Sequence, residues 1–313
     1  MKGLELAKAF YEAYGEPMLR EQFPEWRKKI AVGLVGSGSE CFGFDDEISS
    51  DHDFEPGFCL FLPDETVIDR QVAFRLERAY AKLPKEFCGF SRQTMSPVGG
   101  NRHGVKRTSD FYLEKVGSPN GILTTEQWLS LPSYALAEAT NGEVFYDAAG
   151  EFSAIRKGLC EMPEDVRRKR IAGNLLLMAQ AGQYNYNRCL SHGESGAAQL
   201  AVIEFVKAAM QVVFLLNRAY MPYYKWSFRA LRKLPKFSEL ADTLEFLLTT
   251  ENSGELKETK YLILEDIASM TIAELNEQNL TKAICGDLEK HAYSVNDSIA
   301  DPELRNRNIF AAV

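Results

Sequence analysis

The sequence lacks paired cysteines and clustered histidines. Its six cysteines are scattered over 313 residues and include no C-x-x-C pair, and its four histidines show no metal-ligand spacing. This pattern excludes a disulfide framework and a Cys/His zinc site. It is typical of buried thiols in a reducing compartment, so we expect a cytoplasmic protein.

The chain also has no excess of basic over acidic residues. The chain has 36 Lys and Arg against 44 Asp and Glu, which gives a formal net charge of −8. Proteins that grip long nucleic acids usually present a basic surface, because neutralising phosphates supplies much of the affinity. We therefore do not expect DNA or RNA to be the main substrate. The acidic balance is compatible with a cationic small molecule.

No uninterrupted apolar run of the length of a membrane-spanning helix stands out, and the first sixteen residues carry charges instead of an apolar signal core. The sequence therefore predicts no membrane partner. It contains no internal repeat and no low-complexity segment. A chain of 313 residues can form one large domain or two ordinary ones.

The most informative segment spans residues 36–58. An apolar stretch at 30–35 predicts a strand, and a second apolar stretch at 58–62 predicts another. Between them lie a Gly-Ser turn at Gly38-Ser39 and, after a short acidic spacer, the pair Asp51 and Asp53. The segment thus places a glycine turn and an Asp-x-Asp pair next to two strands.

Asp51 and Asp53 would point to the same side of a strand, because side chains alternate along it. Two carboxylates at such close range repel each other and resist joint ionisation. A bound Mg²⁺ or Mn²⁺ removes this conflict, because hard cations prefer carboxylate and phosphate oxygens. The pair is therefore a candidate catalytic metal site.

The Gly-Ser turn offers what carboxylates cannot. Glycine permits a positive φ and a close approach to the backbone. Successive N–H groups and the hydroxyls of Ser39 and Ser50 can then hold the oxygens of a phosphate chain. We therefore take Gly38, Ser39 and Ser50 as candidate nucleotide-binding residues.

A structural interpretation of the same residues is available. Asp-x-Asp pairs and Gly-Ser turns are common, and Ser50, Asp51 and Asp53 can serve as turn and cap residues before a strand. The order strand, Gly-Ser turn, spacer, Asp-x-Asp and strand within about thirty residues favours the functional interpretation.

The residues Gly38-Ser39 with Gly43, followed by Ser50-Asp51-x-Asp53, resemble the signature of the nucleotidyltransferase superfamily with the polymerase-beta-like fold. Much of the chain is similar to an uncharacterised bacterial family with a nucleotidyltransferase-like N-terminal domain and a helical C-terminal domain. The weaker pieces of this similarity are 102–105, 142–147 and 222–226. The resemblance implies metal-dependent transfer of a nucleoside monophosphate, with AMP from ATP as the default, to a hydroxyl of a small-molecule acceptor.

The predicted fold class is α+β. We expect a small mixed-sheet nucleotidyltransferase-like domain over residues 1–150 and an α-helical bundle over residues 151–313. The expected helices of the bundle are 164–190, 195–220, 237–250, 256–275 and 279–295. In the first domain we expect strands at 30–36, 53–62 and 103–107 and a helix at 65–82.

The superfamily usually adds a third carboxylate on a neighbouring strand. Here the sequence departs from that pattern, because residues 103–107 carry Lys106 and Arg107 where an acid is expected. Asp110 is the nearest candidate for a third metal ligand, and its alternative role is to cap a helix. Arg102 is a candidate phosphate ligand.

Two further candidates lie in the predicted bundle. The resemblance to aminoglycoside nucleotidyltransferases implies a glutamate there as general base, and Glu194 is our candidate; its alternative role is that of a favourable acid at a helix start. Lys225 lies among aromatic residues after Pro222 and can bind a triphosphate or cap the end of a helix.

Two other functions remain open. A nucleotidyltransferase that modifies a protein would dock its substrate on the acidic helical surface. A nucleotide sensor without catalysis is favoured by the missing third acid.

Overall fold

The computed structural model describes residues 1–46, 55–92 and 102–313. The predicted residues Ser50, Asp51 and Asp53 lie outside the described residues. The chain forms two compact units, Met1–Thr124 with Tyr134–Glu161 and Thr125–Ser133 with Met162–Val313. The helix that follows the predicted domain boundary at residue 150, α7 (Glu151–Cys160), belongs to the first unit.

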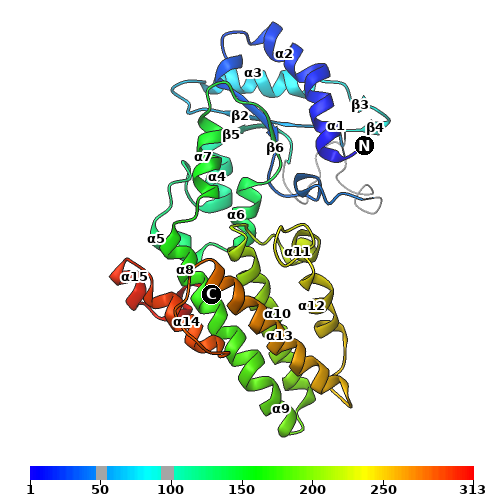
Figure 1. Cartoon of the computed structure of the whole chain (residues 1–313). Coiled ribbons are helices and arrows are strands. Elements are labelled where there is room, and N and C mark those ends of the chain that lie inside the picture. The colour runs from blue at the N-terminus through cyan, green and yellow to red at the C-terminus, as the bar shows by residue number, and fades with distance from the viewer. Residues whose placement is uncertain (47–54, 93–101) are drawn as a thin grey trace. The chain divides into compact units, whose positions relative to one another are not determined.

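The first unit contains a four-stranded mixed sheet with the order β5-β2-β1-β6 (Figure 1). These strands are β5 (Gly104–Arg107), β2 (Cys59–Leu62), β1 (Ala31–Leu34) and β6 (Glu143–Tyr146). Strand β1 is antiparallel to β2 and to β6, whereas β2 and β5 are parallel. With helices around this sheet and a separate helical unit, the predicted α+β fold class is confirmed.

The other elements of the described first unit are mainly helices. They are α1 (Gly3–Phe10), η1 (Tyr11–Gly15), α2 (Glu16–Gln22), η2 (Arg27–Lys29), η3 (Glu40–Phe42), α3 (Arg70–Ala81), α4 (Thr108–Val116), α6 (Ser133–Thr140) and α7. A short hairpin, β3 (Glu86–Phe87) with β4 (Phe90–Ser91), completes them.

Strand β2 is buried on both faces. On one face Leu60 and Leu62 belong to a cluster with Phe10 of α1 and Leu76 of α3. On the other face Phe61 stacks on Phe152 of α7, with 4.2 Å between the ring centroids. This double burial explains why β2 is continuously apolar instead of alternating.

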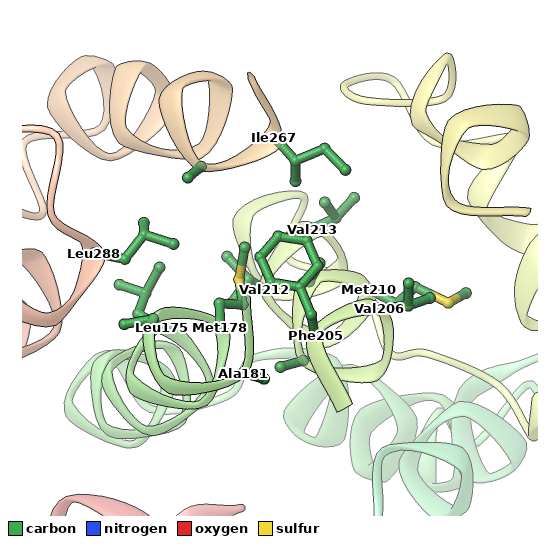
Figure 2. Close-up of a cluster of buried hydrophobic side chains, with 14 of the residues drawn as sticks. Leu175, Met178, Ala181, Phe205, Val206, Met210, Val212, Val213, Ile267 and Leu288 are labelled. Carbon is green, nitrogen blue, oxygen red and sulfur yellow. The ribbon is translucent and has the colours of Figure 1, made fainter. Parts of the chain in front are cut away.

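The second unit is entirely helical over its described residues. Its elements are α5 (Thr125–Ser130), α8 (Glu164–Met178), η5 (Ala179–Tyr186), α9 (Asn187–Ser191), α10 (Ser195–Leu216), α11 (Tyr224–Leu231), α12 (Leu240–Thr249), α13 (Leu256–Glu277), α14 (Leu288–Asp297), α15 (Pro302–Asn306) and η6 (Ile309–Ala312). Helices α8, α10 and α13 line one core, and Phe205 lies among aliphatic side chains there (Figure 2).

Helix α10 is the one described helix that bears on the expectation of no membrane-spanning run. It has 22 residues, and its most apolar 18-residue window has a mean hydropathy of 1.7, which is enough by length and composition to cross a membrane. However, 67% of its most apolar window is buried inside the unit. Its apolar character therefore serves the core of the bundle.

Three predicted element starts were too early by five or more residues. The helix expected from residue 65 begins at Arg70, because Asp69 caps it by accepting a hydrogen bond from Val72 N at 2.8 Å. The helix expected from residue 279 begins at Leu288, where Asp287 is the cap. The strand expected from residue 53 begins at Cys59 after Pro56-Gly57. Local caps and a proline set these boundaries.

Glu164 anchors the start of α8 through three arginines. Its carboxylate accepts hydrogen bonds from Arg167 Nη2 at 2.8 Å, Arg168 Nε at 3.3 Å and Arg218 Nη2 at 3.1 Å. Burial alone would raise the pKa of Glu164, but the bonds and charges of the arginines, Arg167 first, lower it to about 2.

We expect the Glu164→Gln variant to lose about 1 kcal/mol of unfolding free energy at pH 7. The full pKa shift would give about 3 kcal/mol, but the side chain is 39% exposed, and solvent screens such pairs. Because the folded-state pKa lies below the unfolded value, the contribution is present above about pH 4.5. It is lost as the pH falls toward 2.

Urea unfolding of wild type and variant at pH 7 and at pH 3 checks this expectation. The difference between the two proteins should shrink at the lower pH. The matched control is Glu204→Gln, which removes an exposed acid paired only with Lys207 among the described residues, at 3.2 Å. A loss in Glu164→Gln that stays constant with pH would contradict the assignment.

Candidate functional site

One end of the sheet brings together the turn that follows β1 and the starts of three other strands. Gly33 in β1 pairs with Cys59 at the start of β2, and Cys59 pairs with Gly104 at the start of β5. On the other side Leu34 pairs with Glu143 at the start of β6. The predicted Gly38-Ser39 turn therefore lies at the same sheet end as residue 102 and the chain that enters β2.

Asn141 fixes the backbone of this turn. Gly36 N donates to Asn141 Oδ1 at 2.8 Å, and Asn141 Nδ2 donates to Gly36 O at 2.7 Å. The next residue, Gly142, has φ +68°, and a Cβ there would lie 2.9 Å from the backbone carbon of Leu34. Only glycine fits this close approach, which keeps Asn141 against the turn.

A second contact holds Ser37. Its hydroxyl donates to Glu138 Oε2 at 2.7 Å, and Lys115 Nζ lies 2.8 Å from both the hydroxyl oxygen and Glu138 Oε2. Burial alone would lower the pKa of Lys115, but its bond to Glu138 raises it above the usual value. Lys115 is therefore a fixed positive charge beside the turn.

Gly38 and Ser39 are half-buried, and the side chain of Glu40 folds over Gly38. Gly38 has φ +130°, and a Cβ there would lie 2.6 Å from the carboxyl carbon of Glu40. The nearest guanidinium is that of Arg102, with Nη1 3.7 Å from Glu40 Oε1. Burial raises the pKa of Glu40, and the positive charge of Arg102 opposes this effect.

His103 lies next to Arg102 and pairs with the residue that enters β2. Its Nδ1 is 3.1 Å from Glu55 Oε1, and the imidazole is 9% exposed. A Cβ on Gly57 would lie 2.7 Å from the imidazole, so Gly57 leaves the space that the ring occupies. These contacts are those of a hydrogen-bonded structural histidine.

The metal site itself is not described. Asp51 and Asp53 lie outside the described residues, and within 1–46, 55–92 and 102–313 no group of three His, Cys, Asp or Glu residues could hold an ion. Carboxylates remain the chemistry that Mg²⁺ prefers, so the Asp pair fits the ion by donor type. Its geometry stays a prediction.

Asp110 lies at the other end of β5. The strand separates Arg102, before Gly104, from Asp110 in the first turn of α4, and four residues of strand span about 13 Å. Asp110 is exposed and lines a cavity of 320 Å³ with Lys106 and Glu77. The structure therefore does not bring Asp110 to the Gly-Ser turn.

The two candidates in the second unit lie near opposite ends of the core helix α10. Glu194 is exposed and precedes α10, without a side-chain cap bond. Lys225 is exposed in α11, which follows the other end of α10, and its Nζ lies 4.9 Å from the ring centroid of Trp226. Helix α10 rises about 33 Å between these ends, so Glu194 and Lys225 cannot act on one ligand together.

Sequence reasoning did not identify several residues that hold or cover the turn. Asn141, Glu138 and Lys115 hold its backbone and hydroxyl, and Glu40 covers it. Of these residues, only Glu40 could have been identified from the sequence, because it follows Gly38-Ser39 directly. The others lie 75 or more positions further along the chain.

Comparison with known proteins gives one family match. Residues 128–227, which are 100 of the 313 residues, match the model of a domain of unknown function, DUF4037. This stretch includes Glu138 and Asn141, which hold the turn, as well as Glu194 and Lys225. No curated protein matches the chain.

Proposed function

We propose that the protein is a metal-dependent nucleotidyltransferase that transfers a nucleoside monophosphate, AMP from ATP by default, to a hydroxyl of a small acceptor. The observation that carries this proposal is that the Gly-Ser turn is held in place by other residues of its unit. Asn141 holds its backbone from a distant part of the sequence, and the chain returns from the Asp-x-Asp segment into β2 at the same sheet end.

The described residues suggest how the phosphates would be bound. Backbone N–H groups near Gly38 and the hydroxyl of Ser39 would hold the phosphate chain, and the positive charge of Arg102 would neutralise part of its charge. Asp51 and Asp53 would hold Mg²⁺ or Mn²⁺, which would supply further neutralisation of the triphosphate. Positioning of this kind accounts for most of the catalysis in such transfers.

The roles of Asp110, Glu194 and Lys225 have less support. Asp110 lies across the length of β5 from the turn, so we leave it out of the proposed metal site. Glu194 as general base and Lys225 as a nucleotide ligand remain predictions from the sequence. If Lys225 takes part, its aromatic neighbours offer a stacking surface for a base.

A second candidate function is a nucleotide sensor without transfer activity. The position of Asp110 favours it, because the length of β5 separates this acid from the Gly-Ser turn. Both candidates fit a cytoplasmic protein. All six cysteines are free, and burial raises the pKa of Cys59 to about 11, which keeps this thiol unreactive near pH 7.

The test compares Gly38→Ala with Gly43→Ala. Both glycines have a positive φ, of +130° and +64°, so alanine strains the backbone at both. A methyl group at Gly38 would enter the space beside the Glu40 carboxylate where we propose that the phosphate binds, whereas a Cβ at Gly43 meets nothing within 4 Å. We expect Mg·ATP to bind about tenfold more weakly to Gly38→Ala than to Gly43→Ala.

Calorimetry with Mg·ATP and detection of pyrophosphate with candidate acceptors provide the measurements. Pyrophosphate release together with transfer of the α-labelled phosphate supports the transferase, and binding without release supports the sensor. Equal ATP affinity in the two variants would remove the turn from the nucleotide site.

A further inference from the structure

The side chain of Glu40 lies over Gly38 of the Gly-Ser turn. A Cβ on Gly38 would lie 2.6 Å from the Glu40 carboxyl carbon and 2.7 Å from Oε2, so the carboxylate rests directly on this glycine. Ser39 Oγ is 3.5 Å from Oε2, and the Glu40 carboxylate accepts a bond from its own backbone N–H. The carboxylate thus uses the backbone and hydroxyl donors that the proposed function assigns to a phosphate.

Glu40 is poorly satisfied in this position. The residue is 8% exposed, and Oε1 has no hydrogen-bond partner among the described residues. Arg102 Nη1 is 3.7 Å away, which gives an ion pair but not a hydrogen bond. A buried carboxylate oxygen without a donor costs free energy, so little is lost when Glu40 moves away.

The charges around Glu40 are mixed. Burial raises its pKa; Arg102 and His103 oppose this effect, and Asp45 adds to it. Asp45 is itself buried, with Oδ1 unpartnered among the described residues. The negative charge of Asp45 therefore opposes the attraction of Arg102 for Glu40, which weakens the hold on the Glu40 carboxylate.

We propose that Glu40 occupies the phosphate position of the Gly-Ser turn in the nucleotide-free protein and must leave it before a phosphate binds. This inference rests on the proposed nucleotide function. A carboxylate and a phosphate are both anionic acceptors for the same donors, so they compete for the turn. Glu40 thereby excludes weakly charged anions and selects polyphosphates, whose larger charge displaces it.

The experiment uses inorganic tripolyphosphate in EDTA as a metal-free probe and Mg·ATP as the nucleotide. Both are titrated by calorimetry into wild type, Glu40→Gln and Glu40→Ala. Glu40→Gln removes the charge and keeps the shape, and Glu40→Ala also vacates the space. We expect tripolyphosphate to bind about tenfold more tightly to both variants than to wild type.

Glu143→Gln is the matched control. Glu143 lies at the same sheet end beside Leu34, but it is 45% exposed and pairs with Lys8 at 2.6 Å. Its removal changes the net charge equally without vacating the turn, so we expect affinity within twofold of wild type. Thermal unfolding confirms that each variant is folded before titration.

The outcomes separate the two proposals. Equal binding in Glu40→Gln and wild type, with Mg·ATP bound by both, overturns the role of Glu40 and leaves the proposed function intact. Weaker binding in Glu40→Gln shows that Glu40 assists phosphate binding, which also overturns the competition. Failure of every variant to bind either ligand overturns the proposed function and this inference with it.

Discussion

The double variant Asp51→Asn/Asp53→Asn is expected to bind ATP equally well with and without Mg²⁺, and to lose transfer activity by about 10³-fold. Asparagine keeps the size of each side chain and removes its charge. A divalent cation prefers charged carboxylates to neutral amides, so the site loses its ion while the Gly-Ser turn stays intact. ATP binding should therefore fall to the level that the turn alone supports.

Calorimetric titration of ATP into both proteins, with Mg²⁺ and with EDTA, measures this effect. The matched control is Asp46→Asn/Glu47→Gln, which removes two acidic charges from the same spacer but leaves the Asp-x-Asp pair. Its binding should keep the metal dependence of wild type. If wild type and Asp51→Asn/Asp53→Asn respond to Mg²⁺ alike, these two aspartates do not hold the ion.

The sequence predicted the turn because all of its signals are local. The strand before Gly38-Ser39 and the apolar run of β2 lie within a span of about thirty residues, and their pairing confirms that the turn ends one strand and adjoins the next. The α+β class followed from the same kind of pattern. Strands and helices with clear periodicity need no knowledge of distant residues.

The supports of the turn could not be predicted in this way. Asn141 reaches Gly36 across 105 positions, and Lys115 reaches Ser37 across 78. An Asn-Gly pair before a strand predicts a turn, but it does not say which backbone the side chain will bind. Only the pairing of β1 with β6 brings these residues together.

Asp110 shows that closeness in sequence does not ensure closeness in space. Its closeness in sequence to 103–107 suggested closeness in space to the Asp pair. The direction of β5, parallel to β2, puts the start of the strand at the turn and its end, before Asp110, at the far side of the sheet. Strand direction is set by tertiary pairing, so the sequence alone left it open.

The largest stability effect is expected in the second unit, at Phe205. This side chain is fully buried in α10 and belongs to the largely aliphatic core cluster of the second unit (Figure 2). Truncation to alanine leaves a cavity in a close-packed core and should cost about 3–5 kcal/mol of unfolding free energy. Urea unfolding followed by far-ultraviolet circular dichroism measures the loss.

A second variant, at Gly182, tests which residue the ring of Phe205 packs against. A Cβ on Gly182 would lie 2.7 Å from Phe205 Cε2, so the ring packs directly against the glycine of η5. Gly182→Ala should therefore cost about 1–3 kcal/mol by overpacking. In the double variant the methyl group enters space that the ring has left, so the combined loss should fall short of the sum by at least about 1 kcal/mol.

Gly196→Ala is the control for helix propensity. Gly196 lies in the first turn of α10, and a Cβ there meets nothing within 4 Å. Its effect should add to that of Phe205→Ala, because the two sites share no contact. If the losses of Gly182→Ala and Phe205→Ala are also additive, the ring of Phe205 does not rest on this glycine. A coupled loss would identify Gly182 as the packing partner of Phe205, a pairing across 23 positions that helical periodicity alone does not reveal.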